Sequence, residues 1–452
     1  MNKIKIDLFK YSQNIFRVSL IHYKHKMNIL IIGSGGREHA FAWKIKQSPH
    51  CKNLFIAPGN TGTALCGTNL PIGISDFEKL ATCSIENNID LILVGPEEPL
   101  VKGITDFFQQ NEITKHIHII GPSMHAAQLE GSKAFAKDFM TRHNIPTATY
   151  KEFTVNDFDA GIEYLTQHTY PVVLKADGLA AGKGVLICNT VLEARAEFEL
   201  MLLRSKFGEA GKKVVVEDFL EGIELSVFVL TDGVDYLILP EAKDYKKIGK
   251  GDTGLNTGGM GAVSPVPILT EELKQKIIEQ IVEPTINGLQ KDKLHYKGFV
   301  FIGLMINNNE PMVIEYNCRM GDPETEVVLP RLKNDIVELL LATSNGTLKD
   351  QLIKTDERSA VAMVAVSGGY PGDYKKNIVI NGLDNYDLPD SFLFHAGTLL
   401  KEENIVTNGG RVLVAVSFGE NIKEANEKAD YLLQQINFED MKYRDDIGYE
   451  FL

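Results

Sequence analysis

The sequence has little of several features on which common protein classes depend. It contains only five cysteines, and none of them forms a CxxC pair, which argues against a zinc site or a disulfide framework and favours a reducing, cytoplasmic compartment. No segment approaches the roughly 18 uninterrupted apolar residues of a membrane helix. The net charge of −13 argues against nucleic acid as a partner. A soluble globular protein is therefore the expected class.

The chain of 452 residues is too long for a single domain. Its first 26 residues differ from the rest because they carry six basic residues against one acidic residue. This leader lacks the serine and arginine richness of a transit peptide and the apolar stretch of a signal peptide. We expect residues 1–26 to be an extension, disordered or not native, upstream of a start at Met27.

The segment 27–127 alternates between short apolar runs and helical stretches. Residues 27–47 predict a strand, a glycine turn and a helix, and further strands are expected at 53–57, 90–94 and 117–120. This alternation predicts a parallel sheet in an N-terminal α/β domain. The strands end at turn residues, and ligands of such sheets bind at these ends.

The remaining chain changes to hairpins and predicts two α+β domains. Residues 170–188 predict a strand, a glycine-rich loop and a strand, residues 212–233 predict two strands joined by a polar hinge, and residues 298–317 predict a hairpin. We place the middle domain at 128–353, with a mobile lid at about 148–216. A small C-terminal domain follows at 357–452, with strands at 360–366 and 411–417 and a helix at 421–436.

The turn "GSGGRE" (33–38) follows the first strand. Its glycines allow backbone N–H groups at a helix start to approach a phosphate, and Arg37 adds positive charge. As a dinucleotide fingerprint it is incomplete, because Glu38 replaces the third glycine and no acid ends the second strand. We expect an anion-binding loop, with a tight structural turn as the alternative.

Three further glycine-rich or hinge segments have the composition of a nucleotide site. In "LKADGLAAGKGV" (174–185), glycines surround Lys183 and Lys175 ends the strand, which predicts a loop closing over phosphates rather than a surface hairpin. The hinge between Glu217 and Glu224 can offer backbone groups to adenine and a carboxylate to ribose. The polar segment 249–265 is too rich in glycine for a helix or strand, so we expect an ordered ligand-binding loop.

The stretch "VIEYNCRMGDPETE" (313–326) begins as a strand with polar side chains at alternate positions. Strict alternation places Val313, Glu315, Asn317 and Arg319 on one face. The core face would then hold Ile314, Tyr316, Cys318 and Met320. Glu315 and Asn317 can share one hard cation through oxygen, and Arg319 can reach a phosphoryl group. The alternative is a Glu315–Arg319 salt bridge on an exposed face.

These segments resemble the phosphoribosylamine–glycine ligase family (glycinamide ribonucleotide synthetases) of the ATP-grasp superfamily. The resemblance covers 27–452 and rests on motifs in the family's order: "GSGGREHA", "VGPEEPL", "LKADGLAAGKGV", "GDTGLNTGGMGAVSP", "RMGDPETE", "SGGYPGDY", "FHAGT", "TNGGRVL" and "YRDDIG". It implies that ATP, glycine and 5-phosphoribosylamine give glycinamide ribonucleotide, ADP and phosphate through a glycyl phosphate, in purine biosynthesis.

The resemblance also implies roles for individual residues. Glu315 and Asn317 would bind Mg²⁺ or Mn²⁺, and Arg319 and Lys175 would act in catalysis. The ATP-binding residues would be Lys133, Lys175, Gly178, Gly182, Lys183, Gly184, Glu217, Phe219, Leu220 and Glu224. The substrate-binding residues would be Gly33, Gly35, Gly36, Arg37, Glu38, Gly95, Pro96, Glu97, Asp252, Thr253, Asn256, Thr257, Gly258, Gly259 and Asp322.

Two departures from the family pattern and three alternatives stay open at this point. Gly303 stands where many ATP-grasp enzymes carry a second metal carboxylate, and "AKDYKK" (242–247) leaves the roles of Lys243 and Tyr245 undefined. The alternatives are another ATP-grasp carboxylate–amine ligase, a nicotinamide-dependent oxidoreductase and a non-catalytic nucleotide-binding regulator. We expect a monomer or a weak homo-oligomer with no macromolecular partner.

Overall fold

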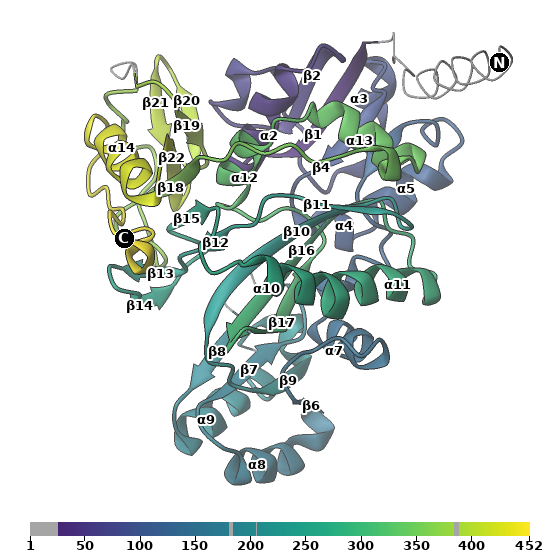
Figure 1. The fold of residues 1–452 in the computed structure, drawn as a ribbon, viewed down its shortest axis with the longest axis vertical. Helices are drawn as coiled ribbons and strands as arrows, with labels where there is room; N and C mark the ends of the chain where they lie inside the picture. The colour runs from purple at the N-terminus through teal and green to yellow at the C-terminus, as the bar shows by residue number, and fades with distance from the viewer. Residues whose placement is uncertain (1–25, 180–183, 205, 384–387) are drawn as a thin grey trace, which may run out of the picture.

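The structure is a computed structural model that describes residues 26–179, 184–204, 206–383 and 388–452 (Figure 1). Its N-terminal unit is a five-stranded parallel sheet in the order β3-β2-β1-β4-β5. The strands are β1 (Met27–Gly33), β2 (Cys51–Pro58), β3 (Thr68–Asn69), β4 (Leu91–Val94) and β5 (His118–Ile120). The predicted parallel α/β domain is therefore confirmed, whereas the leader up to residue 25 lies outside the described residues.

Strand β1 shows why this sheet is covered on both sides. Ile29 and Ile31 belong to one buried cluster, whereas Leu30 and Ile32 belong to another. Alternate side chains of a strand point to opposite faces, so a continuous apolar run needs two layers of cover. The helices of this unit are α2 (Gly36–Lys46), α3 (Phe77–Glu86), α4 (Glu97–Val101) and α5 (Ile104–Gln110).

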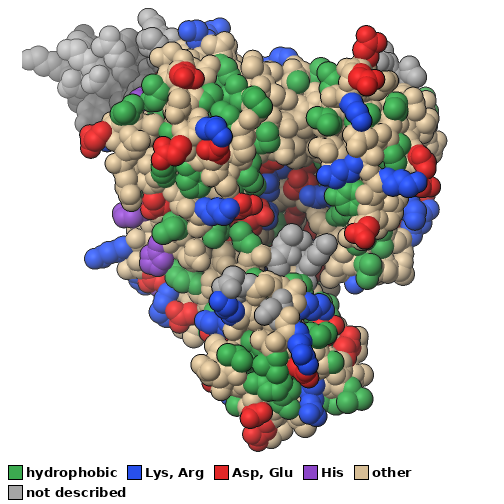
Figure 2. Space-filling model, turned by 180° about the vertical axis from the view of Figure 1, so that it is seen from behind, with side chains coloured by type: hydrophobic (Ala, Val, Ile, Leu, Met, Phe, Trp, Pro, Cys, Tyr) green, Lys and Arg blue, Asp and Glu red, His purple; other side chains and the backbone are tan. Residues whose placement is uncertain are grey.

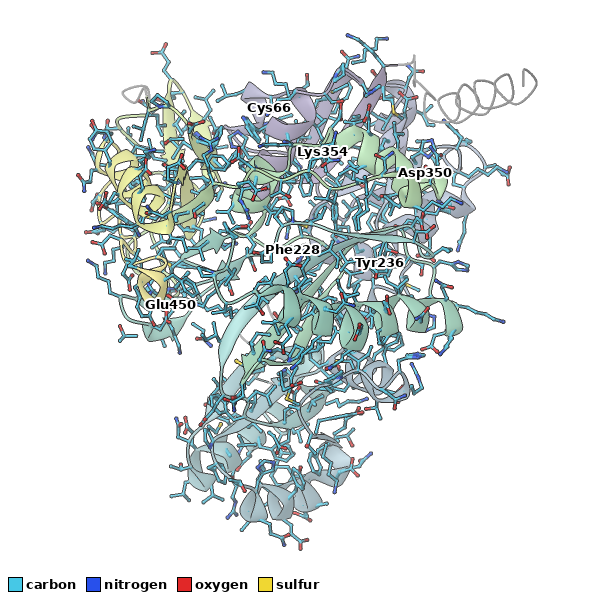
Figure 3. The ribbon with its side chains drawn as sticks, in the orientation of Figure 1. Cys66, Phe228, Tyr236, Asp350, Lys354 and Glu450 are labelled. Atoms are coloured by element: carbon cyan, nitrogen blue, oxygen red, sulfur yellow. The ribbon has the colours of Figure 1, made fainter. Side chains whose placement is uncertain are left out.

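The central sheet is antiparallel and has the order β11-β10-β16-β17. Its strands are β10 (Ile223–Thr231), β11 (Tyr236–Ile238), β16 (Gly298–Asn307) and β17 (Glu310–Asn317), so the hairpin predicted over 298–317 is confirmed. Val227 packs with the cluster under α10 (Glu271–Ile277) and α11 (Glu283–Lys291), which a π-helical turn joins. Phe228 packs on the opposite face, near the middle of the molecule (Figure 3). This sheet is therefore buried between two layers.

A second antiparallel sheet forms a separate lobe at the bottom of Figure 1. Its order is β6-β9-β7-β8, with β6 (Tyr150–Thr154), β7 (Val172–Ala176), β8 (Val185–Cys188) and β9 (Lys213–Asp218). Helices α8 (Phe158–Gln167) and α9 (Val191–Leu202) pack on it and close its own core. Strands β9 and β10 belong to different sheets, so the hinge at 219–222 connects two lobes rather than two paired strands. We call this lobe the lid.

The C-terminal sheet takes strands from two distant parts of the chain, in the order β12-β15-β18-β22-β19. Its strands are β12 (Lys243–Asp244), β15 (Gly261–Ser264), β18 (Ser359–Val366), β19 (Ser391–His395) and β22 (Arg411–Gly419), and α14 (Ile422–Gln434) covers it. A ribbon of β13 (Lys247–Gly249) and β14 (Thr253–Asn256) precedes β15, and a hairpin of β20 (Thr398–Lys401) and β21 (Asn404–Thr407) follows β19. The prediction that 249–265 contains no strand is therefore wrong, because long-range pairing with β18 and within the ribbon overrides local glycine content.

The units are connected through helices α6 (Gln128–Gly131), α7 (Lys133–Arg142), α12 (Thr325–Arg331) and α13 (Ile336–Asn345). Helix α12 packs between α2 of the N-terminal unit and the C-terminal sheet. Among the described residues, no helix is long and apolar enough to cross a membrane.

The N-terminal and C-terminal units meet along an aromatic seam. Trp43 on α2 lies 4.8 Å from Phe392 and 5.9 Å from Phe394 of β19, measured between ring centroids. Nδ1 of His39 accepts the backbone N–H of His395 at 2.8 Å. Burial lowers the pKa of both histidines, to about 3 for His39 and about 4 for His395. The seam is therefore built around two neutral imidazoles.

Candidate active site

The candidate active site lies where the N-terminal sheet, the central sheet, the lid and the C-terminal unit approach one another. Figure 2 shows acidic and basic side chains gathered in a hollow between the two upper lobes, above the lid. The central strand β17 and the turn after it supply its floor. Side chains from the other three units reach this floor, as the following contacts show.

Strand β17 carries a β-bulge that changes which side chains share a face. Leu304 pairs with Val313 and Gly303 pairs with Glu315, so Ile314 is an extra residue between them. Val313 is fully buried in the same core cluster as Tyr316. The prediction that Val313 shares the polar face of Glu315 is therefore wrong, because the bulge resets the alternation, and Ile314 is not a buried core residue.

Glu315 and Asn317 have the chemistry that a hard divalent cation requires. No described side chain or N–H group donates a hydrogen bond to either side chain. Burial alone would raise the pKa of Glu315, but Lys246, Lys133, Lys175 and Arg319 outweigh it and lower that pKa. An ionised carboxylate and an amide oxygen fit Mg²⁺ or Mn²⁺.

Position 303 faces this pair as the sequence indicated. Gly303 lies opposite Glu315 in the register, and a Cβ added there would be 3.2 Å from Glu315 Cγ. A side chain at this position would crowd the carboxylate. The neighbouring strand therefore contributes space rather than a second metal ligand.

Arg319 does not form the alternative salt bridge with Glu315. Its guanidinium lies 2.9 Å from the buried carboxylate of Glu130 and 3.5 Å from Glu97. Burial favours the neutral form of Glu97, but Arg319 and Arg37 hold its pKa below the usual range. Arg319 thus connects the central sheet to α4 and α6. Sequence reasoning missed Glu130, although it lies three residues before Lys133.

Two lysines and one glutamate form a buried triad between the lid and α7. Glu217 Oε2 lies 2.9 Å from Lys175 Nζ and 3.0 Å from Lys137 Nζ. Lys175 also donates to the carbonyl of Ile314 at 3.0 Å, so the bulge provides an acceptor for a lid residue. Burial lowers the pKa of Lys137 to about 8, although Glu217 opposes the shift. Sequence reasoning missed Lys137, which lies one helical turn after Lys133 on α7.

The hinge after Glu217 places several predicted residues between the lid and the central sheet. Phe219 and Leu220 are half-buried between the two lobes. The carboxylate of Glu224, at the start of β10, contacts Lys246, and Lys246 lies 3.8 Å from Asp244. Burial opposes the charge of Lys246, but these neighbouring carboxylates raise its pKa well above the ordinary value. Lys246 and Asp244 were missed, although both lie in the "AKDYKK" segment.

The glycine-rich lid loop is only partly within the described residues. Gly178 and Gly184 flank it, and the carbonyl of Gly184 accepts the N–H of Ala176 at 2.8 Å. Asp177 is anchored by Ser132, which donates at 2.8 Å. Gly182 and Lys183 lie outside the described residues.

The turn "GSGGRE" holds a carboxylate of its own chain. Glu38 accepts the N–H groups of Ser34 at 3.1 Å and of Gly35 at 2.6 Å. A Cβ at Gly33 would lie 2.5 Å from Glu38 Cδ, and a Cβ at Gly95 would lie 2.1 Å from Glu38 Oε1. The expectation that these amides face a phosphate does not fit this arrangement, because the helix-capping side chain already occupies two of them.

Two arginines connect the N-terminal and C-terminal units to the turn after β17. Arg37 contacts Glu38 at 2.7 Å and donates to the carbonyl of Met320 at 3.2 Å. Arg411, from the C-terminal sheet, lies 3.1 Å from Asp322 and donates to the carbonyl of Gly258 at 2.6 Å. Sequence reasoning missed Arg411, although the motif "TNGGRVL" contains it. Gly36 packs against α12, and Pro96 precedes α4.

The predicted loop 249–261 divides into two parts. Thr257, Gly258 and Gly259 lie near the turn after β17, since a Cβ at Gly259 would be 2.5 Å from Pro323. Asp252 instead lies 2.7 Å from Arg444 near the C-terminal end of the chain. Thr253 and Asn256, which follow Asp252, belong to the exposed ribbon strand β14. The structure therefore brings only the second half of the loop to the active-site turn.

Two further carboxylates lie buried after Asp322. Glu324 accepts from Ser226 at 3.2 Å, and burial together with Asp244 raises its pKa to about 7. Burial and Asp322 raise the pKa of Glu326 well above its usual range, and its oxygens have no described partner. Neither residue had an assigned role in the sequence analysis. Both bring proton-holding groups to the wall of the site.

The fold defines an ATP-grasp enzyme: two antiparallel sheets with lysines on one side and the side chains of Glu315 and Asn317 on the other. Three family models match the chain. They describe the phosphoribosylglycinamide synthetase N domain over 27–130, the ATP-grasp (A) domain over 131–325 and the C domain over 360–450.

Relatives support the same assignment at the level of the whole chain. A phosphoribosylamine–glycine ligase from Escherichia coli O157:H7 is 47% identical over 427 residues, covering 94% of this chain and 98% of that protein. The crystal structure of the Thermotoga maritima phosphoribosylamine–glycine ligase matches with a TM-score of 0.80 and 33% identity, over 93% of this chain and 100% of that one. A Campylobacter jejuni biotin carboxylase, at 16% identity, 94% coverage of both chains and a TM-score of 0.69, shows the fold alone. The chain belongs to the phosphoribosylamine–glycine ligase family.

Proposed function

We propose that this protein joins glycine to 5-phosphoribosylamine at the expense of ATP. The products are glycinamide ribonucleotide, ADP and phosphate, a step of purine biosynthesis. The observation that carries the proposal is the convergence of Lys175 from the lid and Glu315 and Asn317 from β17 in a chain of this family. Cationic groups on one side and a metal face on the other are what the transfer of a phosphoryl group requires.

The reaction proceeds in two steps. The glycine carboxylate attacks the γ-phosphorus of ATP, which forms glycyl phosphate and releases ADP. The amine of phosphoribosylamine then attacks the glycyl carbonyl carbon, loses a proton and expels phosphate. Both steps depend on positioning and charge neutralisation rather than on a protein nucleophile.

The side chains divide this work according to their location. We assign Lys133 and Lys175 to the nucleotide phosphates, the hinge with Phe219 and Leu220 to adenine, and Glu224 to ribose. Mg²⁺ or Mn²⁺, when bound by Glu315 and Asn317, supplies positive charge beside the phosphates. Lys137 holds Glu217 and thereby keeps Lys175 oriented, since both lysines share one carboxylate oxygen.

The substrate side is assigned to the N-terminal and C-terminal units. Arg37, Arg319 and Arg411 surround the turn after β17 and offer cations to a sugar phosphate or an acyl phosphate. Glu97, 3.5 Å from Arg319, and Asp322, 3.1 Å from Arg411, are carboxylates that suit an amine. The half-loop Thr257–Gly259 has the small side chains that a substrate as small as glycine requires.

Water exclusion is assigned to the lid. An acyl phosphate hydrolyses in water, so the site has to close during the reaction. The lid, proposed at about 148–216 within a middle domain of 128–353, carries Lys175 on β7 and is joined to the rest by the hinge at 219–222. The proposed flanking domains are 27–127 and 357–452.

The test is ADP release with each substrate omitted in turn. ADP should form rapidly only when ATP, glycine and phosphoribosylamine are all present. ADP formation that ignores glycine would refute the assignment and favour another ATP-grasp carboxylate–amine ligase, which a panel of small amino acids would then identify. A cytoplasmic location and a monomeric or weakly oligomeric state complete the proposal, and the five free cysteines are consistent with a reducing compartment.

A further inference from the structure

Lys243 and Tyr245 both bind one carboxylate near the C-terminal end of the chain. Lys243 Nζ lies 2.7 Å from Glu450 Oε1, and the Tyr245 hydroxyl donates to Glu450 Oε2 at 2.8 Å. The Lys243 ammonium also lies 3.8 Å from the centroid of the Tyr245 ring. Figure 3 places Glu450 at the outer edge of the C-terminal unit, away from the central sheet. Lys243 and Tyr245 thus bind one carboxylate oxygen each of the same glutamate.

Asp244 and Lys246, which alternate with Lys243 and Tyr245, face the proposed nucleotide site instead. Lys246 contacts the Glu224 carboxylate and lies 3.8 Å from Asp244 Oδ1. Its positive charge also lowers the pKa of Glu315. Alternate residues of an extended segment face opposite sides. The four residues 243–246 therefore connect Glu450 on one side with the site carboxylates on the other.

The rest of the C-terminal segment holds the adjoining ribbon. Arg444 lies 2.7 Å from Asp252 and 2.8 Å from Asp446, and Asp446 also accepts the N–H of Gly251 at 2.7 Å. Tyr245 itself is only 1% exposed and packs in the C-terminal core. These contacts fix the backbone of the 243–256 segment from its outer side.

We propose that Lys243, Tyr245 and Glu450 are positioning residues for nucleotide binding, acting through Lys246. This inference rests on the proposed function for the assignment of Glu224 to the nucleotide. The outer contacts set the backbone, and the backbone sets where Lys246 meets Glu224. Loss of the outer contacts leaves Lys246 free to shift and makes the ribose side less complementary to the nucleotide. Lys243 and Tyr245, whose roles the sequence left undefined, therefore act together.

The first experiment replaces Glu450 and measures nucleotide binding directly. Glu450→Ala should weaken the binding of MgADP about tenfold in titration calorimetry, because both outer contacts are lost. The KM for ATP should rise by a similar factor, whereas kcat and the KM for glycine should change less than about twofold. Glu439→Ala is the matched control, since Glu439 is an exposed glutamate of the same unit whose ion pair with Lys375, at 3.2 Å, lies outside this cluster. Equal MgADP affinity in the wild type and both variants would overturn the proposal.

The second experiment tests whether the outer contacts act as a unit. Tyr245→Phe removes one hydroxyl and keeps the buried ring, so it should weaken MgADP binding less than Glu450→Ala does. The double variant should bind MgADP no more weakly than Glu450→Ala alone, because both changes remove the same contact. If the losses of MgADP affinity in the two single variants added up fully in the double variant, the coupling between Tyr245 and Glu450 would be refuted. MgADP binding requires neither glycine nor phosphoribosylamine, so these results are separate from a failure of the glycine-dependent reaction.

Discussion

Acidification should weaken the seam between the N-terminal and C-terminal units through His39 and His395. Their pKa values in the folded protein are about 3 and about 4, against an ordinary value of 6.5. Between the folded-state pKa values and the ordinary value of 6.5, the unfolded chain therefore binds more protons than the folded chain. The free energy of unfolding falls as the pH decreases through this range. For one such histidine, linkage gives a loss of about 2 kcal/mol between pH 7 and pH 5.

The assay uses the one tryptophan of the chain, Trp43, which lies in this seam. Urea unfolding followed by its fluorescence at pH 7, 6 and 5 reports the free energy of unfolding near the two histidines. His39→Asn keeps a hydrogen-bond acceptor for the His395 N–H but cannot be protonated in this range. This variant should lose about 2 kcal/mol less than the wild type between pH 7 and pH 5.

The control removes a histidine that has no part in the seam. His116 is exposed, so His116→Asn should keep the pH dependence of the wild type. Glu324, whose pKa is raised to about 7, contributes with the opposite sign, because the folded state then binds the extra proton. Its contribution is common to all three proteins and cancels in the comparison. Equal losses in the wild type and His39→Asn would refute the reasoning.

Two substitutions test the site and the packing beside it. Glu315→Gln should lower ATP-dependent turnover about 100-fold or more and weaken Mn²⁺ binding. The control Glu310→Gln, on the exposed end of the same strand, should change neither quantity. Full activity of Glu315→Gln at saturating Mg²⁺ would contradict the metal assignment. Gly36→Ala should destabilise the protein by about 1–3 kcal/mol in urea unfolding, because its Cβ would lie 2.4 Å from Glu326 Oε1. Gly73→Ala is the control, since no atom lies within 4 Å of the added Cβ, and equal stabilities would show that the Gly36 contact relaxes at no cost.

Much of the fold follows from local sequence, because its signals are short-range. The strand, turn and helix at 27–47 and the hairpin at 298–317 form as predicted. The bulge at Ile314 could not be predicted in this way, since it depends on how β17 pairs with β16 rather than on the residues of β17. The strands within 249–265 were missed for the same reason, as β15 forms against β18 about 100 residues further along the chain.

The candidate site shows the same division. Lys175, Glu315 and Asn317 were predicted because glycine loops and alternating polar residues are visible in the sequence. Lys246 and Arg411 were missed, although both lie in segments that the sequence singles out, because only the fold brings them beside Glu224 and Asp322. A motif therefore marks a segment of a site assembled from four units, but not which of its charged side chains meet the others.

The capping of α2 by Glu38 has a consequence for comparing related sequences. Gly33 and Gly95 are small because the Glu38 side chain fills the space that their own side chains would take. The three positions are therefore under one shared steric constraint, although 57 residues separate Glu38 from Gly95. We expect positions 38 and 95 to covary: where position 38 carries a shorter side chain, the requirement for glycine at 95 is relaxed, whereas position 33 still requires glycine because its φ is +133°. A glycine in such a turn can thus be required by the packing of a neighbouring carboxylate side chain rather than by the close approach of a bound phosphate.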